Sequence, residues 1–177
     1  NQDKTESWNG ASWTAVNTLT TARSGLTGVG ANNTSALAFG GATSPKQQTE
    51  LWNGTSWTAV NGLTTGRTSI GAAGIATAAL AFGGDTGPAH VAITEQWNGT
   101  SWAEVSDLTT ARSALAGAGT QTSALAIAGE GPPGGAVANV ESWNGTNWTE
   151  TTDLNTARYI LAAAGVDNTS ALAFGGG

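Results

Sequence analysis

The sequence contains no cysteine and no methionine in 177 residues, and it has a single histidine, His90. Without cysteine, disulfide bonds and thiolate metal sites are excluded. One histidine with no cysteine partner does not supply the ligand set of a transition-metal site. We therefore expect no cofactor and no metal, and the sequence identifies no catalytic, cofactor-binding or metal-binding residue. Because position 1 is not methionine, we expect a processed chain or a piece of a longer one.

Long hydrophobic runs and charged residues are also scarce. No run approaches the ~20 apolar residues of a transmembrane helix, and no signal-like segment follows a basic start. Only 10% of residues are charged, and the formal net charge is −6. Since two lysines are the only cations outside a repeated arginine position, binding to nucleic-acid phosphates or anionic lipid is not expected. We expect neither a nucleic-acid partner nor a membrane partner.

What the sequence does have is one unit written four times. Each copy opens with a W-x4-W string, WNGASW, WNGTSW, WNGTSW and WNGTNW, and an arginine follows the first tryptophan after fifteen residues. The first tryptophans are Trp8, Trp52, Trp97 and Trp143, and the arginines are Arg23, Arg67, Arg112 and Arg158. A unit of this length buries its core only by stacking on its copies. We expect one domain over residues 1–177, with repeats at about 5–49, 50–94, 95–140 and 141–177.

The first half of each repeat predicts a β-hairpin. Asn9-Gly10 and its three equivalents lie between strand-forming residues. Asn-Gly favours a two-residue type I′ turn because both central residues need positive φ. The arms would then be TESW and ASWTAV, with Trp8 opposite Ala11 and Glu6 opposite Trp13, so that the two tryptophan rings lie diagonally.

The second half of each repeat predicts two further strands. A stretch of small apolar residues, SGLTGVGA in the first copy, precedes SALAFGG, in which Leu37 and Phe39 alternate with alanines. The rival interpretation, an alanine-rich helix, conflicts with the glycines. Four short strands per repeat are typical of a β-propeller blade. We expect an all-β propeller of four-stranded antiparallel blades.

These residues resemble the kelch repeat. Its diglycine is matched by Gly40-Gly41, Gly83-Gly84 and Gly175-Gly176. The third copy has Ala128-Gly129 instead, so we expect the chain to turn less sharply after that strand. The first tryptophan of each pair stands where kelch repeats usually have tyrosine, and the second matches their tryptophan: Trp13, Trp57, Trp102 and Trp148. The strings WNGTSW and TSALAFGG also resemble repeat arrays in structural proteins of marine phages.

The kelch resemblance implies that the repeats are offset from the blades by half a blade. Kelch blades begin with their inner strands, but this chain begins with an outer pair, residues 5–16, and ends with an inner pair, residues 158–176. Unpaired edges invite strand addition, so we expect a strand-exchange (velcro) closure between these two hairpins. Closure between two chains would make an eight-bladed homodimer with C2 symmetry. Closure within one chain would make a four-bladed monomer, and both alternatives remain open.

Most of the conspicuous residues are interpreted as framework. The tryptophan pairs fit either blade packing or sugar stacking, and in-register repetition favours packing. The repeated arginines and glutamates (Glu6, Glu50, Glu95 and Glu141) fit either an acid–base set or structural pairs, and we favour the pairs. No nucleophile elbow or oxyanion motif is present. The chain is therefore expected not to be an enzyme.

Recognition is expected where the copies differ. One loop per blade varies in length: ATSPKQQT, DTGPAHVAIT and EGPPGGAVANV. These loops carry all four prolines, Lys46 and His90, and we expect the His90 side chain to be solvated. Loops on a rigid scaffold commonly carry binding residues, although drift in a tolerant loop explains the variation equally well. The expected function is a non-enzymatic scaffold or binding module for a protein or glycan, with a lectin-like glycan binder as the alternative. A virion or extracellular location, or an engineered or evolutionary fragment, fits this expectation.

Overall fold

The computed structural model describes all 177 residues and contains sixteen strands and no helix. Three four-stranded sheets form complete blades, and two two-stranded sheets lie at the ends. The blades are β3 (Thr27–Asn32), β4 (Ser35–Phe39), β5 (Thr49–Trp52) and β6 (Trp57–Val60); β7 (Gly71–Ile75), β8 (Ala78–Phe82), β9 (Thr94–Trp97) and β10 (Trp102–Val105); β11 (Ala116–Gly119), β12 (Ala124–Glu130), β13 (Ala136–Trp143) and β14 (Trp148–Glu150). The end sheets are β1 (Thr5–Trp8) with β2 (Trp13–Val16), and β15 (Ala162–Asp167) with β16 (Ser170–Phe174).

The prediction of an all-β protein built from four-stranded antiparallel sheets is confirmed. Each complete sheet takes its inner pair of strands from one repeat and its outer pair from the next, as β3–β6 does across residues 27–60. With no helix in the fold, no segment forms a helix that could cross a membrane.

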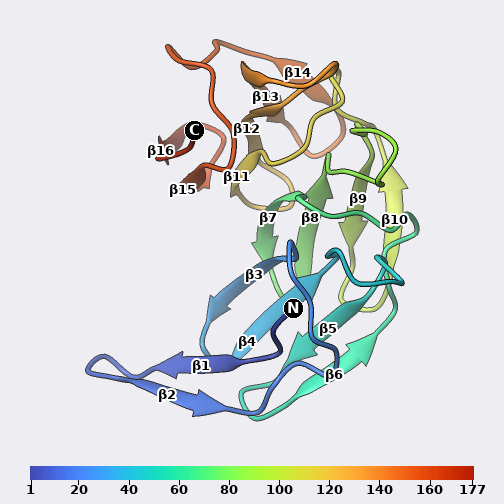
Figure 1. Ribbon diagram of the computed structural model, residues 1–177. Helices are drawn as coiled ribbons and strands as arrows, with labels where there is room; N and C mark the ends of the chain where they lie inside the picture. Colours follow the sequence, from blue (N-terminus) through green and yellow to red (C-terminus); the bar gives the residue numbers. More distant parts are fainter.

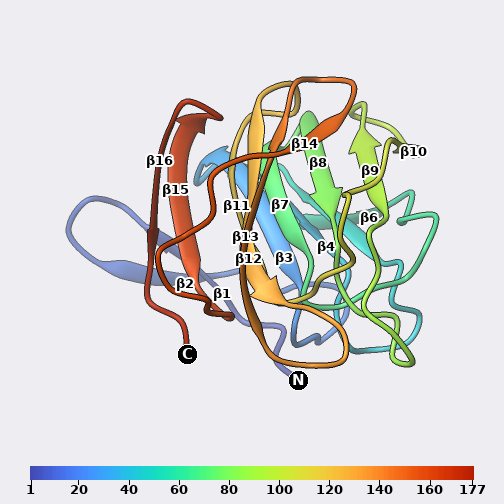
Figure 2. The same ribbon diagram turned by 90° about the horizontal axis from the view of Figure 1, so that it is seen from above.

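The inner strands β3, β7, β11 and β15 follow one another around a central axis (Figures 1 and 2). Small residues line the space between them, including Gly28, Ala73, Ala118 and Ala164. A Cβ at Gly117 would overlap the Ala72 carbonyl oxygen on the neighbouring strand. The Gly/Ala-rich stretch of each repeat is thus required because the inner strands converge.

The predicted hairpin register is wrong. Trp8 lies directly opposite Trp13, and Glu6 lies opposite Ala15. The ring centroids of Trp8 and Trp13 are 5.6 Å apart. The Asn9 side chain explains the difference, because its Oδ1 accepts hydrogen bonds from the backbone N–H groups of Ala11 and Ser12, both at 2.9 Å. A four-residue turn capped by asparagine replaces the two-residue turn, and the same bonds recur at each Asn-Gly.

The third blade departs from the others at the expected place. Strand β12 runs through Ala128-Gly129 as far as Glu130, with a register shift between Ile127 and Gly129. Ala128 keeps a left-handed φ of 55°. The less sharp exit was predicted, but its consequence was not: most of the predicted loop EGPPGGAVANV is folded into β12 and β13.

The hydrophobic core lies between blades. Phe82 of β8 packs edge-on against Trp148 of the next blade, with ring centroids 4.9 Å apart. Phe39 of β4 makes the corresponding contact with Trp102 at 4.8 Å. Leucines flank both contacts, and the resulting clusters bury most of the second inner strand of the first two blades. Packing therefore joins each blade to its successor.

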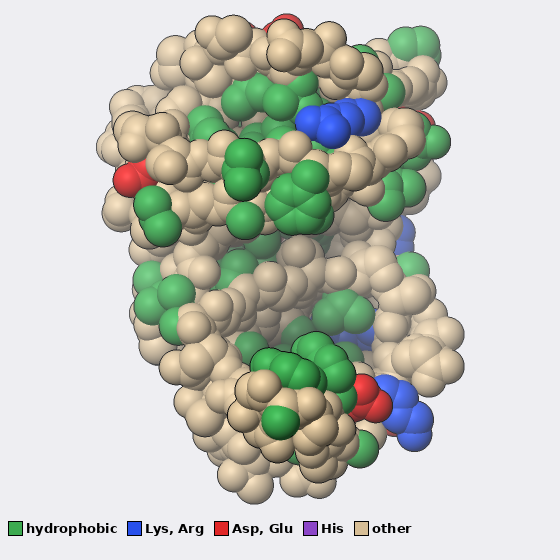
Figure 3. Space-filling view, turned by 90° about the vertical axis from the view of Figure 1, so that its left-hand side faces the viewer, with side chains coloured by type: hydrophobic (Ala, Val, Ile, Leu, Met, Phe, Trp, Pro, Cys, Tyr) green, Lys and Arg blue, Asp and Glu red, His purple; other side chains and the backbone are tan.

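The blades form an open arc. Strands β1–β2 and β15–β16 remain in separate two-stranded sheets, one at each end of the arc. The space-filling view of the open side shows a hollow with hydrophobic side chains gathered above and below it (Figure 3). Strand-exchange closure and the number of blades in the ring accordingly stay predictions.

Candidate functional site

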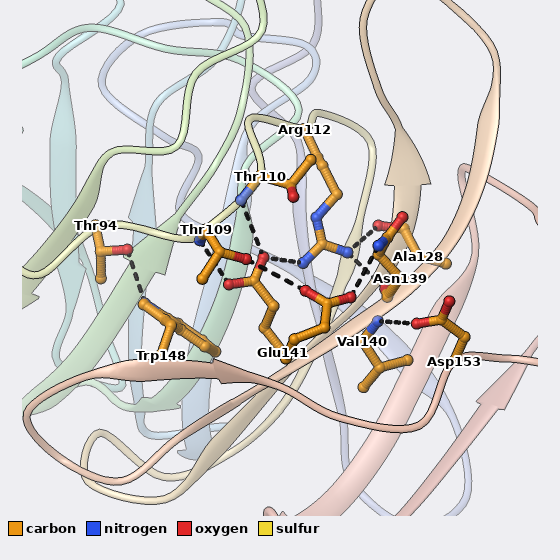
Figure 4. A network of polar contacts seen from close by, with 11 residues as sticks. Thr94, Thr109, Thr110, Arg112, Ala128, Asn139, Val140, Glu141, Trp148 and Asp153 are labelled. Carbon is orange, nitrogen blue, oxygen red and sulfur yellow. Dashed lines mark hydrogen bonds and ion pairs between the residues drawn. The ribbon is translucent and has the colours of Figure 1, made fainter.

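The most elaborate polar site is a buried arginine–glutamate pair in each complete blade (Figure 4). In the third blade, Arg112 Nη2 lies 2.9 Å from Glu141 Oε1, and both side chains are inaccessible to solvent. Arg112 Nη1 donates to the carbonyl oxygens of Ala128 at 3.0 Å and Asn139 at 2.6 Å. The backbone N–H of Thr109 donates to Glu141 Oε2 at 2.6 Å. The pair thus joins the segment between β10 and β11 to strands β12 and β13.

The first two blades repeat this arrangement. Arg23 pairs with Glu50 at 2.9 Å, and Arg67 pairs with Glu95 at 2.8 Å. Each guanidinium also donates to the carbonyl oxygen of the first diglycine residue, as Arg67 does to Gly83 at 2.7 Å. The predicted structural pairs are confirmed in all three complete blades.

Burial sets the electrostatics of these pairs. Loss of hydration lowers the pKa of Arg67, Arg23 and Arg112 below the ordinary arginine value, and the charge of the paired glutamate offsets only part of that lowering. Both Oε atoms of Glu95 and Glu141 accept hydrogen bonds from the protein. The carboxylates thus have their acceptors occupied, and no group of three or more His, Asp or Glu side chains is arranged to hold a metal ion.

Indole N–H groups fix both members of each tryptophan pair in the complete blades, the first within its own blade and the second to the preceding blade. Trp143 Nε1 donates to the Gln121 carbonyl oxygen at 2.9 Å, and Trp148 Nε1 donates to the Thr94 hydroxyl of the preceding blade at 3.0 Å. Both rings are buried, as are Trp52, Trp97 and Trp102. Only Trp8 and Trp13 are largely exposed, at 43% and 66%. The repeated tryptophans are therefore packing residues in the complete blades.

The end hairpins hold the unpaired members of the same sets. Arg158 donates to the carbonyl oxygens of Gly175 at 3.1 Å and Ala173 at 3.2 Å, but it faces no carboxylate. Glu6 on β1 is exposed and accepts no hydrogen bond from an arginine. The sequence indicated the unpaired edges of the two end hairpins, but it did not indicate the exposure of Leu172 and Phe174 on β16.

The variable loops adjoin one another on one face of the arc, and the Asn-Gly turns lie at the opposite ends of the strands. Lys46 Nζ donates to the Thr86 carbonyl oxygen at 3.0 Å, which joins the first loop to the second. A hollow of about 300 Å³ separates the second loop from the third and is lined by Asp85, Gly87, Pro88, Ala89, His90, Pro132 and Pro133. The expectation that His90 is solvated is wrong, because its side chain is 18% exposed and its Nδ1 lies 3.4 Å from Asp85 Oδ2.

Comparison with known proteins adds no family assignment. No known protein family matches the sequence, and no curated protein matches it either. The all-β repeat architecture agrees with a β-propeller, whereas the kelch-like and phage resemblances rest on the sequence motifs alone.

Proposed function

We propose that this chain is a non-enzymatic β-propeller scaffold that binds a protein or glycan ligand through its variable loops. The observation that carries the proposal is the hollow between the second and third loops. It brings the lone histidine, an aspartate and three of the four prolines together. The repeated arginines, glutamates and tryptophans of the complete blades are engaged in internal contacts, so they support the scaffold role.

The chemistry of the hollow suits a small polar segment of a ligand. Pro88, Pro132 and Pro133 supply rigid apolar walls, while Asp85 and His90 supply hydrogen-bonding groups. The loops are tied to each other and to the blades, as by the Asp85 backbone bonds to Thr68 at 2.9 and 3.0 Å. A preorganised site loses less entropy on binding than a mobile one.

A direct test is capture of ligands from protein and glycan arrays by the wild-type chain and two variants. Asp85→Ala should weaken binding about tenfold or more, since a hydrogen bond to a charged group contributes about 1.5–3 kcal/mol. The matched control, Thr100→Ala, changes an exposed residue in an Asn-Gly turn at the opposite end of the blades. Equal binding by both variants would contradict the proposed site.

The alternative is glycan binding through tryptophan stacking. Only the first hairpin could serve as that site, because Trp8 and Trp13 are exposed there. In this case Trp13→Ala would abolish capture of a glycan that Asp85→Ala still binds. The two outcomes separate a loop site from a stacking site.

Ring closure belongs to the same proposal. The scaffold would be completed as an eight-bladed homodimer, with the four-bladed monomer as the alternative. A virion or extracellular surface is the proposed setting, on the strength of the phage-like motifs.

A further inference from the structure

The three complete blades show what the last hairpin requires. In the first two blades, the leucine and phenylalanine of the second inner strand are completely buried against the next blade: Leu37 and Phe39, Leu80 and Phe82. Their repeat equivalents on β16 are Leu172 and Phe174, which are 72% and 53% exposed. Strand β16 therefore presents two core side chains that contact no following blade.

The first blade carries a groove of matching composition. A hollow of about 570 Å³ is lined in part by Leu19, Leu26, Ala36, Ala38 and Trp57, which we call the first-blade groove. The same repeat positions in the third blade are Leu108, Leu115, Ala124, Ala126 and Trp148, and these residues form the core cluster that encloses Leu80 and Phe82. By this correspondence, the side chains that fit the groove are Leu172 and Phe174.

Strands β1–β2 already occupy the outer position beside this groove. Trp57 Nε1 donates to the Thr5 hydroxyl at 2.9 Å, as Trp102 does to Thr49 at 3.1 Å between complete blades. Thus β1 is held where the third strand of a blade belongs, with its inner edge free. Strand β16 likewise has a free edge, because its only partner is β15.

The pairing register between these two edges follows from the complete blades. Ala38 on β4 lies opposite Glu50 on β5, and Phe39 lies opposite Thr49. The equivalent register places Ala173 of β16 opposite Glu6 of β1. It also brings Glu6 to Arg158, so the buried pair found in every complete blade would form a fourth time.

A chain of backbone hydrogen bonds between blades ends at the same junction. Residues with left-handed φ near the axis donate to the preceding blade: Ser69 N to Gly25 O at 3.1 Å, Ala114 N to Ser69 O at 2.9 Å, and Ile160 N to Ala114 O at 2.9 Å. The series leaves the Gly25 N–H and the Ile160 carbonyl oxygen as its free ends. One more blade contact would join them.

We infer that a second copy of this chain closes both open junctions: β16 of each copy pairs with β1 of the other, and Leu172 and Phe174 enter the partner's first-blade groove. This inference deepens the proposed scaffold function and rests on it. The two junctions are identical, so the assembly is a C2 ring.

The size of the ring follows from the arc. Each chain supplies material for four blades, so complete rings contain multiples of four. In the structure the two end hairpins lie in separate sheets on either side of the open hollow, and the chain does not close on itself. Because propellers have about 4–8 blades, a ring of two chains satisfies both conditions.

The test compares the solution mass of two matched variants of the same hairpin by light scattering. Phe174→Asp removes a core side chain from the junction and should weaken association about 30-fold or more, the loss typical of an interface hot spot. Val166→Asp is the control, because Val166 is 74% exposed and its repeat equivalent Ile75 stays 44% exposed inside a complete blade. We expect two chains for Val166→Asp and one for Phe174→Asp.

A second variant tests the opposite face independently. Glu6→Lys places a cation where Arg158 would bind and should also give single chains. A mixture of Phe174→Asp and Glu6→Lys retains one intact junction, so the mixture should form a two-chain complex that neither variant forms alone.

The mass of two chains for both Phe174→Asp and Glu6→Lys, or the mass of single chains for their mixture, would overturn the inference. A wild-type chain that stays single would do the same. A wild-type chain that stays single and still binds a ligand through its loops would overturn the closure alone and leave the proposed scaffold function standing. Loss of folding in Phe174→Asp, monitored by circular dichroism, would leave Glu6→Lys and Val166→Asp as the deciding pair.

Discussion

Arg67 and Arg158 occupy the same place in their repeats but not the same environment. Arg67 is fully buried against Glu95, whereas Arg158 binds two carbonyl oxygens and no carboxylate. The same contrast separates Trp102 from Trp13. At the scale of residues, the contribution of a repeated side chain depends on whether its own blade is complete and whether a neighbouring blade covers it.

Arg67→Leu should lower the free energy of unfolding by about 3–5 kcal/mol, because it leaves Glu95 buried without its partner. Arg158→Leu, made in the Phe174→Asp chain so that no second copy covers it, should cost less than about 1 kcal/mol. Urea denaturation of both variants measures the difference. Equal losses would show that the buried pair is not the source of the effect.

Trp102→Ala should destabilise the chain by about 3–5 kcal/mol, since it opens a cavity between the first and second blades. Trp13→Ala in the Phe174→Asp chain should cost less than about 1 kcal/mol, because that ring is exposed there. Thermal and urea unfolding would check both values, and a small effect at Trp102 would contradict its role as a core residue.

Individual elements were predictable to the extent that their determinants are local. The strand SALAF follows from alternation and the diglycine, the strand TELW follows from the Asn-Gly turn after it, and they form as β4 and β5. The hairpin register was not predictable from Asn-Gly alone, because the Asn9 side chain caps the turn and lengthens it to four residues. The length of the third loop was overestimated, because β12 continues through Ala128-Gly129.

The candidate sites divide in the same way. The arginine–glutamate pairs could be predicted, since opposite charges at fixed positions in every repeat indicate a repeated contact. The position of His90 beside Asp85 depends on the fold of one variable loop, which no other copy repeats. Exposure of Leu172 and Phe174 is a property of the whole arc, so no local pattern distinguishes them from Leu37 and Phe39.

The β15–β16 turn offers a prediction on pH. Hydrogen bonds from the Thr169 hydroxyl, and then from its backbone N–H, lower the pKa of Asp167. A lowered folded-state pKa means that these bonds stabilise the turn above the ordinary aspartate pKa of about 3.9 and lose that effect as the pH falls through the folded-state value.

Asn32 makes the same two bonds to Thr34 in the first repeat, at 2.9 and 2.7 Å. Asp167→Asn should therefore leave the unfolding midpoint unchanged at neutral pH and reduce its decline in acid. Thermal unfolding between pH 2 and 7 checks this. A variant that declines as steeply as the wild type would show that the turn does not contribute to acid sensitivity.

At the scale of the whole molecule, the arc is stabilised blade against blade and is unfinished at both ends. Each junction between two complete blades combines a buried phenylalanine, a tryptophan pair and backbone hydrogen bonds. The two ends carry the complementary halves of one more such junction. An exposed apolar face of this kind commonly marks an interaction surface.

The most direct test of this account is the solution mass of the unmodified 177-residue chain, measured by sedimentation equilibrium over a range of concentrations. Closure by a second copy predicts the mass of two chains, with no larger species as the concentration rises. The mass of one chain throughout that range would contradict it.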